Sequence, residues 1–281
     1  MTASVLTEDV PRARGIVRVL RATHGRMYPR IVGSIREPTW LFYETLLPLL
    51  GTIAFVYVYK AIGAAPRFLG YVVMGGAAAA VWGNVMWNMA SQLWWEKKDG
   101  NLEIYLTAPC GLPPILLGMS IGGIFSSLIR GTAVVVIGSV IFHVPYALTH
   151  LWLFLLVFVV ALVALYGLGV MLSSLFLLWG RESWHTANLF MEPVFLVTGF
   201  YFPVSVLGFW TGVAASIIPL TFALDALRQL LYPDVHPALL SVRVELACLV
   251  ALATIFFFAS RYALRKMEWL ARRAGKLSER L

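Results

Sequence analysis

Long uninterrupted apolar stretches constrain this chain more than any other feature of its sequence. A helix needs about 20 mostly apolar residues to cross the hydrocarbon core of a bilayer. Five stretches meet that length, at residues 39–60, 67–95, 113–142, 151–179 and 240–262. Charged residues make up only 13% of the chain, which is about half of their share in a soluble domain. The sequence therefore predicts an all-α membrane protein that crosses the bilayer several times.

A sixth crossing is predicted at residues 186–206. It is interrupted by Pro193, Gly199 and Pro203. The next apolar stretch, 207–231, holds a proline and two charges and is too broken to span. We expect it to form two short re-entrant half-helices near the outer surface, because irregular backbone is tolerated at membrane depth only where protein or a cavity surrounds it.

Positive charge is concentrated on one side of the predicted six-span bundle. Seventeen of the 22 Lys and Arg residues lie before residue 39, after the last span, or in the loops that six crossings place on that same side. The positive-inside rule makes this side cytoplasmic. Both termini are therefore expected in the cytoplasm, in a multi-pass protein of the cell membrane. Topology explains the net charge of +8, so no nucleic-acid partner is expected.

The whole chain, 1–281, is expected to form one membrane domain with three parts. Residues 1–38 form a cytoplasmic or interfacial segment, 39–262 the six-span bundle, and 263–281 a basic cytoplasmic tail. The first and last parts are amphipathic, with apolar residues on one helical face and arginines around the other. Such helices lie in the membrane interface against lipid head groups. Contact with a cytoplasmic protein is the alternative.

The inventory of reactive groups argues against an enzyme. The five histidines are scattered without metal-binding spacing, and the chain contains no GxxxxGK[ST] phosphate-binding loop. We expect no catalytic residue, no metal site and no cofactor in this chain. Among the charges inside predicted spans, we single out Glu44, Arg130 and Glu192. They are either an Arg–Glu pair that stabilises the bundle or groups that take part in ion transport.

A charged loop lies between the second and third predicted spans, and its residues carry a family resemblance. The stretch EKKDGNLEIYLTAP resembles the polar loop after the second span of ABC-2 type permeases, the membrane subunits of one class of ABC exporter. The matching loop is made of Glu96, Lys97, Lys98, Asp99, Gly100, Asn101, Leu102, Glu103 and Pro109. Asn101 stands where the family usually has Thr.

A second stretch, residues 198–232, is similar to another segment of the same family. The matching residues are Gly199, Phe202, Pro203, Pro219, Leu220, Thr221, Phe222, Asp225 and Arg228. The resemblance assigns this stretch to an outer gate and extends from about residue 25. It is closer to the drug- and antibiotic-exporter branch than to the polysaccharide branch. We expect Thr221 to cap a helix on which Asp225 and Arg228 share a face and pair.

The resemblance implies an export function powered by another protein. In that family the charged loop forms a short coupling helix that docks on a separate ATPase subunit, so ATP and Mg lie on the partner chain. A second permease, identical or paralogous, completes the transporter. The implied cargo is a hydrophobic or amphipathic compound such as a drug, antibiotic or lipid. The alternatives are a lipid-linked polysaccharide or teichoic-acid exporter, an ion-coupled secondary transporter, and a membrane scaffold without transport.

Overall fold

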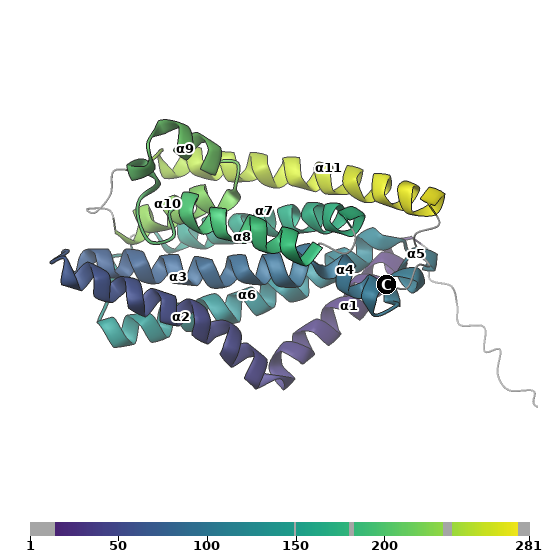
Figure 1. The fold of residues 1–281 in the computed structure, drawn as a ribbon, viewed down its shortest axis with the longest axis horizontal. Coiled ribbons are helices and arrows are strands. Elements are labelled where there is room, and N and C mark those ends of the chain that lie inside the picture. The colour runs from purple at the N-terminus through teal and green to yellow at the C-terminus, as the bar shows by residue number, and fades with distance from the viewer. Residues whose placement is uncertain (1–14, 149, 180–182, 233–237, 275–281) are drawn as a thin grey trace, which may run out of the picture.

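The computed structural model describes residues 15–148, 150–179, 183–232 and 238–274, and every regular element in these ranges is a helix. The long helices are α1 (Ile16–Arg36), α2 (Pro38–Ala61), α3 (Arg67–Val85), α6 (Leu112–Phe142), α7 (Leu151–Trp179) and α11 (Val242–Ala274). The shorter elements are the π-helical turn η1 (Met86–Ala90), α4 (Gln92–Lys98), α5 (Asn101–Thr107), α8 (Ser183–Val197), the 3₁₀ turn η3 (Val204–Leu207), α9 (Phe209–Ala215) and α10 (Pro219–Leu231). The predicted all-α class is confirmed, and Figure 1 shows the bundle that these helices form.

Five helices of the described chain are long and apolar enough to cross a membrane. They are Leu41–Ala61, Phe68–Ala90, Leu112–Phe142, Leu151–Phe176 and Val242–Met267. Each corresponds to one of the five clear apolar stretches of the sequence. The protein is therefore a multi-pass membrane protein.

The sixth predicted span contains only the short helix α8. Its 15 residues rise about 22 Å, which is less than the roughly 30 Å of a hydrocarbon core. Pro193 does not break this helix, contrary to expectation, because α8 continues through it to Val197. The chain turns instead at Gly199, whose φ is 75°. A sixth crossing at 186–206 stays a prediction.

Helix α3 occupies the centre of the bundle. In its most apolar stretch 83% of the residues are buried, against 17–44% in the other four spanning helices. Position 75 of this helix requires glycine, because a Cβ there would lie 1.5 Å from the carbonyl oxygen of Phe200. This close approach brings the turn that follows α8 directly onto α3.

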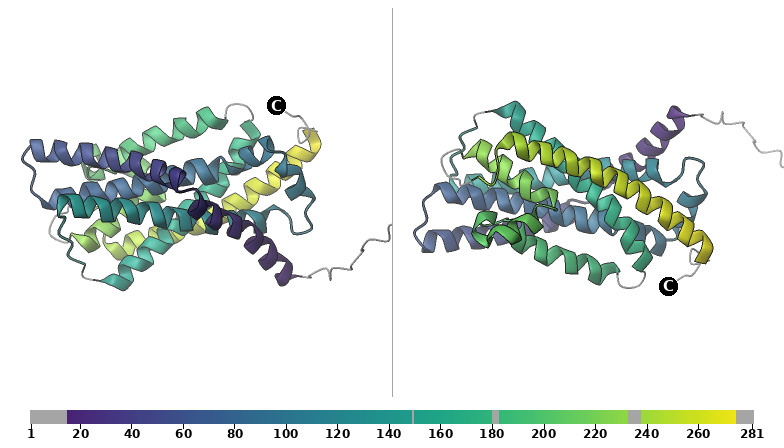
Figure 2. Two further views of the ribbon diagram at one scale, coloured as in Figure 1. Left: turned by 90° about the horizontal axis from the view of Figure 1, so that it is seen from below. Right: turned by 90° about the horizontal axis from the view of Figure 1, so that it is seen from above.

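The two ends of the described chain lie at the same end of the bundle. Helix α1 begins, and α11 ends, beside the α4–α5 segment, and all three views agree on this (Figures 1 and 2). Helices α9 and α10 lie at the opposite end (Figure 1). The side of the membrane that each end faces stays a prediction.

Helix α1 packs along the first turns of α6. The glycine pair of α6 allows this, since a Cβ at Gly118 would lie 2.2 Å from the carbonyl oxygen of Thr23 and one at Gly122 would lie 2.9 Å from Arg30 Cβ. Arg26 and Arg30 of α1 bind Glu96 of α4 and the backbone of Asn88 in η1, whereas the apolar residues Ile16, Val17 and Leu20 are exposed. The expected place of this helix in the membrane interface stays a prediction.

Short helices replace a continuous span over residues 207–231. Helix α10 begins at Pro219, and nearly all of its residues are buried against α3, α7 and α11. Burial in protein is the condition under which a short helix is tolerated at membrane depth. The re-entrant placement of α9 and α10 stays a prediction.

Candidate functional site

The charged loop folds as two short helices, α4 and α5, joined by a turn at Gly100. The φ of Gly100 is 77°, in the left-handed region that glycine adopts without strain. Helix α5 ends at Thr107, and α6 begins at Leu112 with a proline in its first turn. The segment is thus a compact helical hairpin at the end of the bundle.

Glu96 faces the bundle instead of a partner protein, which changes its predicted role. Its side chain is buried and ion-paired with Arg26 of α1. Its other oxygen accepts hydrogen bonds from Asn101 Nδ2 at 3.0 Å and from the Tyr105 hydroxyl at 2.9 Å. Burial, together with this hydrogen bond to Glu96, raises the pKa of Tyr105 to about 12. Tyr105 therefore remains a neutral donor, and Glu96 holds α4, α5 and α1 together.

The outward face of the α4–α5 segment carries the charges that a partner could reach. Lys98, Asp99 and Glu103 are exposed, and Ile104 beside them is 63% exposed. Leu102 of the matching loop is buried in the core of this chain and so is not available to a partner. The candidate contact surface therefore consists of three charges and one exposed isoleucine.

Two of the three predicted intramembrane charges meet. Arg130 of α6 forms an ion pair with Glu44 of α2 and donates a hydrogen bond to Asn84 Oδ1 of α3. The exposed fractions of the Arg130 and Glu44 side chains are 5% and 16%. Glu192 lies apart from them on an exposed face of α8. The pair and Asn84 thus tie three helices together, and removal of one partner would leave an uncompensated, mostly buried charge.

A large groove runs between α2 and α8, with α3 as its floor. Its volume is about 1040 Å³, at the upper end of the range for ligand sites. The apolar part is lined by Leu47, Pro48, Ala79, Ala80, Met191 and Phe195. The polar part is lined by Glu44, Asn84, Asn88, Gln92 and Arg130. The groove can therefore accommodate a molecule with an apolar body and a hydrogen-bonding head.

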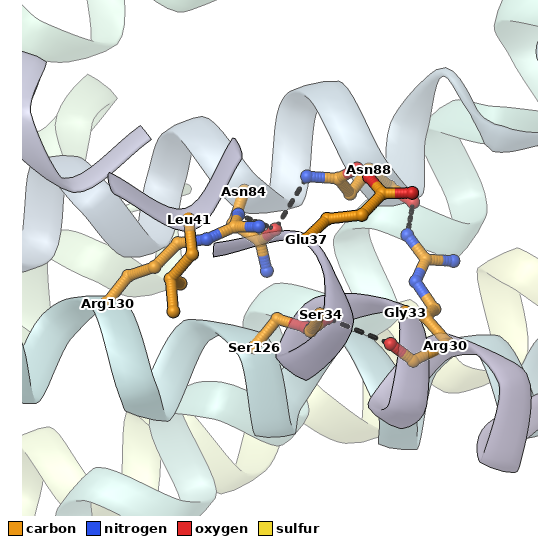
Figure 3. Close-up of a pocket in the computed structure, with 9 residues that line it drawn as sticks. All are labelled: Arg30, Gly33, Ser34, Glu37, Leu41, Asn84, Asn88, Ser126 and Arg130. Carbon is orange, nitrogen blue, oxygen red and sulfur yellow. Dashed lines mark hydrogen bonds between the residues drawn. The ribbon is translucent and has the colours of Figure 1, made fainter. Parts of the chain in front are cut away.

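A small polar pocket of about 100 Å³ lies behind the polar wall of this groove, where α1 meets α2 (Figure 3). Arg30 reaches into it from α1 and donates to the backbone carbonyl of Asn88. The Ser34 hydroxyl lies 2.6 Å from that of Ser126 on α6. Asn88 and Asn84 separate this pocket from the groove, so the same side chains contribute to both.

At the opposite end, Arg228 of α10 anchors the turn that follows α8. It is buried and donates to the carbonyl oxygens of Gly199 at 2.7 Å, Phe200 at 2.5 Å and Tyr71 at 3.0 Å. These acceptors lie on α3 and just before the Phe202–Pro203 turn. The predicted gate residues Gly199 and Arg228 are thus in direct contact.

Asp225 is also buried, which excludes a solvated surface pair with Arg228. Its carboxylate accepts hydrogen bonds from Gln229 Nε2 and the Leu239 backbone N–H, both at 3.0 Å. Gln229 Nε2 also lies 3.0 Å from Glu245 Oε2 on α11. Asp225 therefore helps to fasten α10 to α11.

The predicted capping role of Thr221 is wrong. Helix α10 begins two residues earlier, at Pro219, whose fixed φ suits a first helical position. The Thr221 hydroxyl donates instead to the carbonyl oxygen of Ala215 at 2.6 Å. Thr221 thereby connects α9 to α10.

The sequence analysis missed the amide side chains that lie between the Arg130–Glu44 pair and Glu96. Asn84, Asn88 and Gln92 precede Glu96 at intervals of four residues. Residues four apart share one face of a helix, so this spacing inside an apolar stretch was a detectable signal. The partner of Glu96 carried no such signal, because Arg26 is 70 residues away.

Comparison with known families decides the identity. A sequence model of the ABC-2 type transporter family matches residues 31–232, which is most of the chain. The chain belongs to the ABC-2 type transporter family. The match extends from within α1 of this ABC-2 permease to the end of α10, and so includes the α4–α5 segment, the groove and the Arg228 anchor.

Curated relatives of this ABC-2 permease are also named as permeases. The probable multidrug ABC transporter permease YbhR of Escherichia coli (strain K12) is 26% identical over 139 residues, which cover 50% of this chain and 37% of that protein. The inner membrane transport permease YadH of the same organism is 24% identical over 197 residues, 67% of this chain and 75% of that protein. The permease thus spans little more than a third of YbhR and three quarters of YadH.

Proposed function

We propose that this permease is the membrane subunit of an ATP-driven exporter, with ATP and Mg bound by a separate ATPase subunit. The cargo is a hydrophobic or amphipathic compound, such as a drug, an antibiotic or a lipid. Family membership and the names of the relatives support a transport subunit. The direction of transport, the cargo and the partner are the proposal.

The observation that carries the proposal is the form of the α4–α5 segment. A short helical hairpin fixed to the bundle by the buried Glu96 presents Lys98, Asp99, Glu103 and Ile104 outward. A rigid base with an exposed charged face and one apolar side chain is suited to docking on another protein, because little side-chain and loop ordering is needed on binding.

The same end of the bundle is proposed to face the cytoplasm. The described start of α1, the described end of α11 and the α4–α5 segment all lie there (Figure 1). Most of the basic residues of the sequence belong to these regions, and basic loops are retained on the cytoplasmic side. An ATPase in the cytoplasm can then reach the segment.

The groove between α2 and α8 is proposed to form one wall of the export path. Its apolar stretch and polar end suit an amphipathic compound. A second permease, identical or paralogous, would close the open side of the groove.

The docking proposal is tested first by asking whether an ATPase gene lies beside that of the permease, and then by capture of the ATPase that it encodes. We expect the full-length chain in nanodiscs to bind that ATPase, and the Glu103→Lys, Ile104→Asp double variant to weaken binding at least about tenfold. Lys266→Glu, a charge reversal at an exposed position of α11 near the same end, is the matched control and should bind normally. Equal binding by the double variant and the wild type would remove the α4–α5 segment from the interface.

The energy source is tested in vesicles that contain the permease and this ATPase. Efflux of a fluorescent amphipathic dye should require MgATP and should persist when the proton gradient is collapsed. Dye movement driven by a proton gradient without ATP would favour the ion-coupled transporter instead.

A further inference from the structure

Four polar side chains form a hydrogen-bonded row along one face of the second span and the helix that continues it. We call Asn84, Asn88, Gln92 and Glu96 the polar ladder. They belong to α3, η1 and α4 in turn, and each is in direct contact with the next or is joined to it through Arg30. From Asn84 to Glu96 the ladder extends about 18 Å.

The half of the ladder that contains Asn84 and Asn88 begins at the ion pair in the groove. Arg130, paired with Glu44, donates to Asn84 Oδ1. Asn88 Nδ2 donates to the same oxygen at 2.7 Å. The amide nitrogen of Asn84 is held by Gly123 O, Ser127 and Tyr166, so the Asn84 amide has one fixed orientation.

The half of the ladder that contains Gln92 and Glu96 reaches the α4–α5 segment. Arg30 donates to the backbone carbonyl of Asn88 and, at 2.9 Å, to Gln92 Oε1. Gln92 Nε2 donates to Glu96 Oε1 at 2.6 Å. Glu96 in turn holds Tyr105 of α5. Figure 3 shows the contacts of Arg30, Asn88, Asn84 and Arg130 from the side of the small pocket.

The ladder also lines the groove. Asn84, Asn88 and Gln92 are wall residues of the groove, as are Glu44 and Arg130. A molecule that fills the polar end of the groove therefore meets the same side chains that hold Glu96 in place. Gln92 is the key residue, because it is exposed to the groove on one side and bonded to Glu96 on the other.

A π-helical turn lies within the ladder and supplies an element that can change state. Over Met86–Ala90 the backbone forms a π turn, and the Ser91 N–H bonds to the Met86 carbonyl at 3.2 Å. Single π turns inside α-helices occur frequently at functional sites. A change of this turn to α-helical pairing would rotate Gln92 and Glu96 relative to Asn84.

We propose that the polar ladder transmits the state of the groove to the α4–α5 segment, with Gln92 as the positioning residue that links the two. The role as a transmission element rests on the proposed function, because it concerns the segment that would dock on an ATPase. The hydrogen bonds of the ladder lie within this chain and do not depend on an ATPase. Residues this far apart act independently in the absence of such a connection.

The test measures hydrogen–deuterium exchange at the amides of residues 101–107 in the full-length permease in nanodiscs. Glu44→Gln, which weakens the ion pair at the far end of the ladder, should change exchange in α5 at least about twofold. The same substitution in a Gln92→Leu background should leave α5 exchange unchanged relative to Gln92→Leu alone. Asn88→Ala replaces Gln92→Leu as the interrupting variant if the latter does not fold.

Ser120→Ala is the matched control. Ser120 is buried on α6 and contacts Met89 of η1 but lies outside the ladder, so its loss should leave α5 exchange unchanged. No response of α5 to Glu44→Gln would overturn the proposal, and so would a response that persists when Gln92 is replaced. Because no ATPase is present, these results are independent of the capture experiment, and either proposal can fail alone.

Discussion

The guanidinium carbon of Arg228 lies 3.3 Å from the centroid of the Tyr71 ring. This contact joins α10 to the central helix α3, and the hydrogen bonds of the same side chain hold the carbonyls of Gly199 and Phe200. One buried cation thus fixes the position of α10 relative to both the bundle and the turn after α8. This one side chain therefore stabilises the end of the bundle at which α9 and α10 lie.

Replacing Arg228 should loosen that end of the bundle. Lysine keeps the charge but lacks the planar fork that reaches several carbonyls and stacks on a ring. We expect Arg228→Lys to destabilise the protein by at least about 1.5 kcal/mol, measured by thermal unfolding in detergent. Arg243→Lys, at an exposed position of α11, should have no effect. Equal melting temperatures for the two variants would contradict the anchoring role.

The glycines of α3 should differ sharply in their tolerance of alanine. A Cβ at Gly75 would lie 1.5 Å from a backbone oxygen, whereas at Gly83 the nearest neighbouring atom would be Met191 Cε at 3.7 Å. We expect Gly75→Ala to cost about 1–3 kcal/mol through overpacking and Gly83→Ala to be neutral or slightly stabilising. Thermal unfolding of the two single variants tests this, and an alanine tolerated at position 75 would show that the turn after α8 is not pressed against α3.

Glu245 should be replaceable by its neutral analogue. Its side chain is fully buried, and its Oε2 accepts a hydrogen bond from Gln229 Nε2 at 3.0 Å. A glutamine at this position keeps the shape of the side chain and a carbonyl oxygen that can accept the same hydrogen bond. In thermal unfolding, Glu245→Gln should therefore change the free energy of unfolding by less than about 0.5 kcal/mol, whereas Glu245→Ala should cost about 1–3 kcal/mol. Equal losses in both variants would mean that the site requires the carboxyl group itself and not only an acceptor of this shape.

Topology can be checked by cysteine labelling in a background in which Cys110 and Cys248 are replaced by serine. We expect a cysteine at Gly63 to react with an impermeant reagent added outside, and one at Asp99 to react only after the membrane is opened. Both positions are exposed, in the α2–α3 turn and the α4–α5 turn. Labelling of position 99 from outside would reverse the orientation and remove the basis for a cytoplasmic ATPase.

Local patterns predicted the parts of the structure that depend on neighbouring residues. Hydropathy located five spans, because twenty consecutive apolar residues leave few other folds. The turn at Gly100 was predictable from the residue type. The length of α8 was not, because Pro193 was accommodated within the helix and the chain turned at Gly199.

Contacts between distant segments decided what was not predicted. The charge of Glu96 was interpreted as a surface feature, yet Arg26 from α1 draws it into the bundle. Arg26 and Arg30 of α1 likewise bind α4 and η1 of the same chain. In both cases a charged helix face had two possible partners, and only the tertiary fold selects one.

The packing of α1 on the glycines of α6 has a consequence for biogenesis. The Thr23 hydroxyl bonds to the carbonyl of Pro114, a residue 91 positions later. At 5–20 residues per second, synthesis of that interval takes roughly 5–20 s, during which α1 exists without the surface that will receive it. Its exposed face of Ile16, Val17 and Leu20 gives the nascent helix a place at the membrane surface until α6 has been inserted. Helix α1 is thus synthesised before the surface on which it finally packs.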